Sequence, residues 1–271
     1  MGGSEMYEEY RVGVVIPMYN EEQFVDDVLT GQPAFVDRVY AVDDCSTDGT
    51  WAEIQRHAAT ESHPTDVTTN SHVANSVSPD GGHRQRADIV PIQHDHNRGR
   101  GGAVKTGYKA ALNDEMDIVA VMDGDGQMDP AILDRFLDPI VAGEADYTKG
   151  DRLATPALRE QMSNWRLFGN VLLTGLTRVA SGYWEMSDPQ NGYTAISRDA
   201  LERIDVDDLY EDYGFLNDIL VHLNVHDADV IDVPTAAHYG EEESGIRYRS
   251  FVPLLTVLLL SRFLWRLRLK W

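Results

Sequence analysis

The chain has 271 residues, which is enough for one α/β domain with an appendage and for a sizeable hydrophobic core. Its hydrophobic content of 42% and charged content of 25% exclude a disordered chain. Its net charge of −22 excludes a nonspecific nucleic-acid-binding protein, because phosphate contacts need lysine and arginine. We interpret the acidity as adaptation to high salt, which screens charge repulsion; the alternative is an ordinary acidic soluble protein.

The first half of the chain alternates between strand-like and helix-like patterns. Short apolar, β-branched runs predict strands at 11–16, 36–42, 89–92 and 118–122. Apolar residues at a spacing of three and four predict helices at 21–29, 51–59, 103–112 and 130–141. Between them, a glycine-rich turn is expected at 97–102. Strands that alternate with helices predict an α/β fold with a mostly parallel, Rossmann-like sheet flanked by helices.

The rest of the chain alternates less clearly. One long helix or two are expected at 157–180, and strands at 193–197 and 230–233. We divide the sequence into a polar N-terminal tail at 1–10, a main α/β domain at 11–243 with a polar insertion loop at 60–88, and a C-terminal segment at 244–271. Cys45 is the only cysteine, so no intrachain disulfide is expected, which fits a reducing cytoplasm.

The C-terminal segment differs in charge from the remainder of the chain. Glu243 is the last acidic residue, and an apolar run at 251–260 is interrupted only by Thr256. The run is shorter than the roughly 20 residues that span a bilayer. We expect a basic, amphipathic helix that associates with an anionic membrane surface; the alternative is a core helix with a solvated basic end. Its positive charges are Arg247, Arg249, Arg262, Arg266, Arg268 and Lys270.

Four polar clusters follow the four predicted strands of the first half. In a parallel sheet, ligands bind beyond the carboxyl ends of the strands, so these clusters are expected to share one site. The most informative cluster contains Asp123 and Asp125, whose carboxylates would repel each other unless a cation bound between them. Mg²⁺ prefers such oxygen ligands, and Gln127 adds a neutral one. A calcium loop is excluded because Met128 stands where that loop needs glycine and because a strand precedes it.

Taken together and in order, these motifs resemble those of the family-two, inverting glycosyltransferases of the GT-A fold, over about residues 12–246. The dolichyl-phosphate hexose synthases are the most similar group. The motifs that carry the resemblance are Pro17-x-Tyr-Asn-Glu, Asp43-Asp44-x-Ser-x-Asp-Gly-Thr, Asn97-x-Gly-x-Gly-x-Ala, Met122-Asp-x-Asp-x-Gln, Gly150-x-Arg152 and Asp188-x-x-x-Gly-Tyr193.

The resemblance implies a role for each matching residue. Asp123, Asp125 and Gln127 would hold Mg²⁺ or Mn²⁺ against the diphosphate. Arg152 would contact a phosphate of the donor or of the acceptor, and Asp188 would lie near the acceptor, so that Asp188, Arg152 and Asp125 are the implied catalytic residues. The implied nucleotide-sugar site consists of Pro17, Tyr19, Glu21, Val42, Asp44, Asp123, Gly124, Asp125, Gln127 and Arg152.

One loop departs from the family pattern. Dolichyl-phosphate mannose synthases carry an arginine and a lysine there, where this chain has Tyr239 and Gly245. Arg247 or Arg249 would then take over the contact with the acceptor phosphate. The departure makes a glucose-type donor as plausible as mannose.

The sequence therefore predicts an enzyme that transfers a hexose from a UDP- or GDP-linked sugar to dolichyl or polyprenyl phosphate, with inversion. The reaction would belong to the synthesis of lipid-linked glycans or to protein N-glycosylation, at the cytoplasmic face of the membrane. An alternative acceptor is a sugar hydroxyl on a lipid-linked glycan, which would require Asp188 or Asp218 as a general base. A third hypothesis is a non-catalytic protein that binds nucleotide sugars at the membrane.

Overall fold

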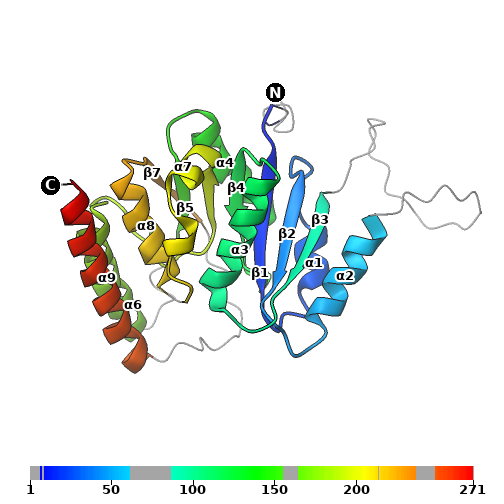
Figure 1. Ribbon diagram of the computed structural model, residues 1–271, viewed down its shortest axis with the longest axis horizontal. Coiled ribbons are helices and arrows are strands. Elements are labelled where there is room, and N and C mark those ends of the chain that lie inside the picture. Colours follow the sequence, from blue (N-terminus) through cyan, green and yellow to red (C-terminus); the bar gives the residue numbers. More distant parts are fainter. Residues whose placement is uncertain are drawn as a thin grey trace, which may run out of the picture.

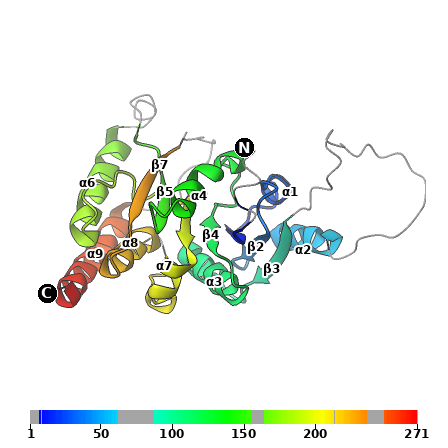
Figure 2. The same cartoon turned by 90° about the horizontal axis from the view of Figure 1, so that it is seen from above.

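A computed structural model describes residues 7, 9–61, 87–154, 164–212, 214–235 and 248–270. Within its helices, residues 60–61, 164–171 and 248–254 are described by their backbone alone. The described chain forms three layers, with a central sheet between two layers of helices, and a further pair of helices at one end (Figures 1 and 2). All statements below concern these described residues.

The described sheet has seven strands in the order β3-β2-β1-β4-β6-β5-β7 (Figure 1). All of them run parallel except β6, which pairs antiparallel with both β4 and β5. The mostly parallel sheet predicted from the sequence is thereby confirmed. The strands are β1 Val12–Met18, β2 Arg38–Asp43, β3 Asp88–Gln93, β4 Ile118–Val121, β5 Tyr147–Asp151, β6 Thr194–Ser197 and β7 Val230–Pro234.

Helices cover both faces of the sheet. Side chains of α1, α2 and α4 pack on one face, and those of α3, α7 and α8 pack on the other. A smaller apolar cluster joins α6 and α9 to α8. The helices are α1 Val25–Thr30, α2 Thr50–Glu61, α3 Gly99–Asn113, α4 Asp134–Val141, α6 Asn164–Ser181, α7 Arg198–Arg203, α8 Phe215–Val225 and α9 Tyr248–Lys270, with short 3₁₀ helices η2 at Pro130–Ile132 and η3 at Val206–Asp208.

The elements predicted for the first half are present, with two corrections. The helix expected from residue 103 begins earlier, at Gly99, so that most of the predicted glycine turn forms the first turn of α3. The glycines permit this because a Cβ at Gly101 would lie 2.7 Å from the carbonyl of Glu211, whose oxygen accepts a hydrogen bond from the Gly102 amide. The helix expected at 130–141 is divided into η2 and α4.

The sequence patterns did not predict β5, α7 or α8. Strand β5 contains Lys149, Gly150 and Asp151, residues that are depleted in strands. Lys149 is only 2% exposed, and its ammonium lies 2.8 Å from the Asp232 carboxylate on β7. The strand is therefore stabilised by a buried ion pair with a distant residue, which the local sequence does not reveal.

The segment predicted as an N-terminal tail contributes to the core. The ring of Tyr7 is 3% exposed and lies 4.7 Å from the ring of Phe35, measured between centroids. The Tyr7 hydroxyl donates a hydrogen bond to the Asp138 carboxylate of α4. Residues 62–86 of the predicted insertion loop lie outside the described residues, between the end of α2 and the start of β3.

The C-terminal segment forms α9, which packs beside α6 and α8 (Figure 1). Its basic side chains bind acidic and polar groups of the domain. Arg262 contacts Asp208 and Asp218, and Lys270 contacts Asp227. Within the described residues, no helix is both long and apolar enough to span a membrane. Arg247 lies outside the described residues, and the side chain of Arg249 is not among those described.

Candidate functional site

The loop after β4 carries the paired carboxylates at the carboxyl edge of the sheet. Its Gly124 packs against β1, where an added Cβ would lie 2.7 Å from Cγ of Met18 and 3.0 Å from the Pro17 carbonyl oxygen. The tight turn is completed by an Asx-type hydrogen bond from the Gln127 amide to the Asp125 carboxylate, at 2.9 Å. The loop therefore presents both aspartates from a position fixed against the neighbouring strand.

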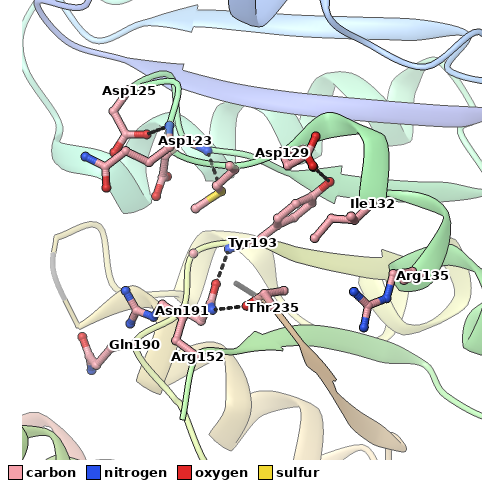
Figure 3. Close-up of a pocket in the computed structure, with 13 residues that line it drawn as sticks. Asp123, Asp125, Asp129, Ile132, Arg135, Arg152, Gln190, Asn191, Tyr193 and Thr235 are labelled. Carbon is pink, nitrogen blue, oxygen red and sulfur yellow. Dashed lines mark hydrogen bonds between the residues drawn. The ribbon is translucent and has the colours of Figure 1, made fainter. Parts of the chain in front are cut away.

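A cavity of about 220 Å³ opens beside this loop (Figure 3). The carboxylates of Asp123 and Asp125 and the amide of Gln127 form one wall, whereas Arg152 lies on another. The cavity thus brings together oxygen ligands and a fixed positive charge. Its lining residues are Asp123, Asp125, Gln127, Met128, Asp129, Ile132, Arg135, Arg152, Gln190, Asn191, Gly192, Tyr193 and Thr235.

Arg152 is held by Asp188. The Arg152 Nε and Nη2 groups donate to the two Asp188 oxygens at 2.8 and 3.2 Å, and the Arg152 amide donates to Oδ2 at 3.2 Å. Asp188 is 3% exposed and does not line the cavity. Burial raises the pKa of the Asp188 carboxyl, but the charges of Arg152 and Lys149 outweigh burial, so the net pKa lies below its usual value. An ionised, fully bonded carboxylate is suited to orienting Arg152 and is a weak proton acceptor at neutral pH.

The segment before β6 adds polar groups to the opposite wall (Figure 3). The Asn191 side chain accepts a hydrogen bond from the Tyr193 amide at 3.0 Å and donates one to the Thr235 hydroxyl at 3.4 Å. It approaches β5 at Gly150, where an added Cβ would lie 2.5 Å from the Asn191 amide nitrogen. The Tyr193 ring stacks on Phe136 of α4, with centroids 4.0 Å apart. The backbone of this wall is therefore held by both β7 and α4.

A buried cluster of hydrogen-bonded polar side chains lies directly after β2 and β3. Asp44, expected to contact the base, is 3% exposed and accepts hydrogen bonds from His94 Nδ1 at 2.7 Å and from the Arg98 amide at 2.8 Å. The other ring nitrogen of His94 lies 2.9 Å from the Thr106 hydroxyl of α3. Val42 is fully buried. Both predicted binding residues are therefore buried, and neither lines the described cavity.

The predicted residues after β1 lie outside the cavity. Tyr19 is 46% exposed, and the backbone amide of Glu21 donates to the Thr50 hydroxyl at 2.9 Å. With Pro17 they occupy the same edge of the sheet as the aspartates, since Pro17 contacts the loop at Gly124. A contact between them and a nucleotide stays a prediction.

Asp218, proposed as an alternative base, is fully buried on α8. Its carboxylate lies 2.7 Å from Arg262 Nε and accepts a hydrogen bond from the Tyr210 amide at 2.8 Å. It does not line the cavity. These contacts make Asp218 a structural anchor for α9, and the base role is not supported for it.

The donor set at the cavity suits a hard divalent cation. Two carboxylates and a side-chain amide line the cavity, and both aspartates are partly exposed. In the described part of the chain, no group of three histidine, cysteine or acidic side chains is assembled for metal binding. The residues therefore fit a cation whose remaining ligands come from a bound diphosphate and water, which is the usual environment of Mg²⁺.

Several residues of the site were not predicted from the sequence. Gln190 and Asn191 lie inside a recognised motif, so their position could have suggested a role. Arg135 on α4 and Thr235 after β7 carry no local signal. Arg100 was not predicted either. In the structure its guanidinium donates a hydrogen bond to Asp123 at 2.6 Å.

The chain matches glycosyl transferase family 2 over residues 13–205 and therefore belongs to this family. Among curated proteins, it is 28% identical over 229 residues to the UDP-N-acetylglucosamine–dolichyl-phosphate N-acetylglucosaminyltransferase of Methanococcus voltae, covering 84% of this chain and 86% of that protein. It is also 28% identical over 247 residues to the undecaprenyl-phosphate mannosyltransferase of Micrococcus luteus, covering 87% and 86% of the two chains.

A similar solved structure is that of the glucosyl-3-phosphoglycerate synthase of Mycobacterium tuberculosis with Mn²⁺, uridine diphosphate and phosphoglyceric acid. The TM-score is 0.61 at 17% identity, and the match covers 97% of this chain and 81% of that one. At this identity the likeness concerns the fold alone. The sheet, its flanking helices and the family match together confirm the GT-A architecture that the sequence motifs implied.

Proposed function

We propose that this protein transfers a hexose from a nucleotide sugar to a dolichyl or polyprenyl phosphate. The observation that carries the proposal is the cavity in which Asp123, Asp125 and Gln127 face the same space as Arg152. Oxygen ligands and a fixed guanidinium around one space suit two anionic substrates that must be brought together. The relatives in Methanococcus voltae and Micrococcus luteus, whose names specify polyprenyl-type phosphate acceptors, support the same acceptor class.

In this proposal, Asp123, Asp125 and Gln127 hold Mg²⁺ or Mn²⁺. The cation would neutralise negative charge on the departing diphosphate. The solved neighbour with Mn²⁺ and uridine diphosphate is consistent with a divalent cation. Pro17, Tyr19 and Glu21, with Asp44 behind them, would border the nucleotide at the same sheet edge.

Arg152 would bind a phosphate, with its orientation fixed by Asp188. A phosphate monoester is largely ionised at neutral pH, since its second pKa is about 6, so an acceptor phosphate needs no strong general base. The lowered pKa of Asp188 and its three hydrogen bonds to Arg152 agree with an orienting role. Attack from the face opposite the leaving diphosphate would invert the anomeric carbon.

UDP- and GDP-linked hexoses both remain in the proposal, with glucose and mannose as the first candidates. The N-acetylglucosamine donor named for the Methanococcus voltae relative widens the panel that has to be tested. The acceptor-side arginines proposed from the sequence, Arg247 and Arg249, are retained as a prediction.

We further propose that the protein binds the cytoplasmic face of the membrane as a peripheral protein. Helices α6 and α9 lie side by side at one end of the molecule (Figures 1 and 2). They expose apolar side chains, whereas the basic side chains of Arg262, Arg266 and Lys270 contact the domain. Exposed apolar side chains on a helix pair support contact with lipid. The exposed side chains are Leu172, Val179, Val257, Leu260, Leu264 and Leu269.

The test is a transfer assay with purified protein, dolichyl phosphate and a panel of UDP- and GDP-linked sugars, with products detected by mass spectrometry. We expect one donor to give a glycosyl phosphodiester product in the presence of Mg²⁺ or Mn²⁺. Asp125→Ala is the matched inactive variant. Transfer that is unchanged by Asp125→Ala, or no product with any donor, would contradict the proposal.

If the acceptor were a sugar hydroxyl, the site would need a different catalytic group. A hydroxyl is a weak acid and needs a general base, for which Asp188 is the remaining candidate. Complete loss of transfer in Asp188→Asn, with nucleotide binding intact, would favour this alternative. A partial loss that follows weaker binding of the acceptor phosphate would favour the orienting role.

A further inference from the structure

Arg100, in the first turn of α3, forms an ion pair with the first aspartate of the loop after β4. Its Nε donates to Asp123 Oδ1 at 2.6 Å, and its Nη2 donates to the Gly192 carbonyl oxygen at 3.1 Å. The side chains of Arg100 and Asp123 are 25% and 26% exposed. Three motifs that lie far apart in the sequence thus meet at a single ion pair beside the cavity.

The backbone is shaped around this pair. An added Cβ at Gly192 would lie 2.5 Å from Arg100 Nη2 and 2.6 Å from Asp123 Oδ2, so any larger residue there would shift one member of the pair. On the other side, the Gly102 amide donates to the Glu211 carbonyl oxygen at 2.8 Å and fixes the first turn of α3. One oxygen of Asp123 is therefore bound by Arg100 and the other faces Gly192.

This geometry places a fixed positive charge on a carboxylate that the proposed cation would use. Arg100 offsets the negative charge of Asp123 next to Asp125, on a chain whose net charge is −22. A second cation brought close to the guanidinium would be repelled by it, and it would compete with Arg100 for the same carboxylate. An anionic diphosphate in the cavity would be attracted by the same guanidinium.

We propose that Arg100 is a built-in counter-cation for Asp123, which the divalent cation must displace, and that the released guanidinium then binds the diphosphate of the donor. This inference rests on the proposed function. Arg100 therefore lowers the affinity of the free protein for the cation and raises the affinity of the cation-bound protein for the nucleotide. The consequence is that cation and nucleotide bind together and not separately.

The test measures the two affinities separately in Arg100→Gln. Mn²⁺ binding without nucleotide is followed by the electron paramagnetic resonance signal of free Mn²⁺, and binding of UDP and of GDP is followed by calorimetry at saturating Mn²⁺, where Arg100 is released from Asp123. We expect Arg100→Gln to bind Mn²⁺ roughly tenfold more tightly, which corresponds to about 1.4 kcal/mol, and to bind the nucleotide several-fold more weakly. Arg100→Lys, which keeps the charge, should stay close to the unmodified protein.

Lys109→Gln is the matched control. It removes one positive charge from the other end of α3, where Lys109 pairs with the Asp207 carboxylate, roughly 13 Å along the helix. We expect it to change neither affinity. If Arg100→Gln weakens both affinities, Arg100 only supports the fold of the loop, and the inference is wrong. If the unmodified protein binds no Mn²⁺ even with nucleotide, the proposed function fails at its metal site and the inference fails with it.

Discussion

The half of the described chain from β1 to β4 and the half from β5 to α9 differ in the surroundings of their key charged side chains. In the first half, Asp123 and Asp125 line a cavity at the end of a strand. In the second half, Lys149 of β5 pairs with Asp232 of the adjacent strand β7, and Arg262 of α9 pairs with the buried Asp218 of α8. The two aspartates after β4 thus face a space for ligands, whereas Lys149 and Arg262 of the second half hold elements together.

The largest effect that would test this comparison is expected at Asp218. Asp218→Asn leaves Arg262 without the charge of its fully buried partner, and breaking such a pair costs about 3–5 kcal/mol of unfolding free energy. Urea unfolding followed by tryptophan fluorescence measures the loss. The matched control is Lys270→Met, which removes an exposed ion pair of the same helix and should leave the midpoint unchanged. Equal effects of the two variants would show that the buried pair has no special role in docking α9.

The same difference explains how much of the molecule could be predicted from its sequence. The four strands of the first half and the site residues Asp123, Asp125 and Gln127 were predicted because each polar cluster directly follows an apolar run. The ion pair of Arg100 could not be predicted, because it depends on how α3 and the segment before β6 approach each other. Local sequence patterns predict where strands end, but they do not predict contacts between segments that are far apart in the sequence.

In the second half, local patterns were misleading for physical reasons. Strand β5 was missed because its buried lysine is neutralised by a residue on β7. The basic residues of the C-terminal segment suggested a charged face for lipid, yet Arg262 and Lys270 bind acidic residues of the domain. The halophilic origin inferred from the net charge stays a prediction.

A smaller effect, dependent on pH, is expected for Asp188→Asn. The pKa of Asp188 is lowered in the folded protein, so its ion pair stabilises the fold at pH values above the unfolded pKa of about 3.9. This contribution is lost as the pH falls through the lower, folded pKa. We expect the variant to be less stable than the unmodified protein by about 2–3 kcal/mol at pH 7, below the usual cost of a broken buried pair because Arg152 is 31% exposed and can be solvated.

Urea unfolding at a series of pH values between 7 and 3 measures this difference. It should shrink below about pH 4, because Asp188 of the unfolded chain then binds a proton, and the ion pair is lost when the folded carboxyl binds one at lower pH. A difference that stays constant down to pH 3 would show that the asparagine perturbs packing and that the Arg152 ion pair is not what stabilises this wall of the cavity.

The smallest effect on stability is expected at Asp125, because this carboxylate of the first half lines the cavity. Asp125 is partly exposed beside Asp123, so Asp125→Ala removes a like charge together with the hydrogen bond from the Gln127 amide, and it should lower the unfolding free energy by no more than about 1 kcal/mol. The same variant should lose Mn²⁺-dependent binding of nucleotide in calorimetry. A loss of stability comparable to that of Asp218→Asn would mean that this carboxylate also holds the fold together, and the distinction between ligand-facing and structural charges would no longer separate the two halves.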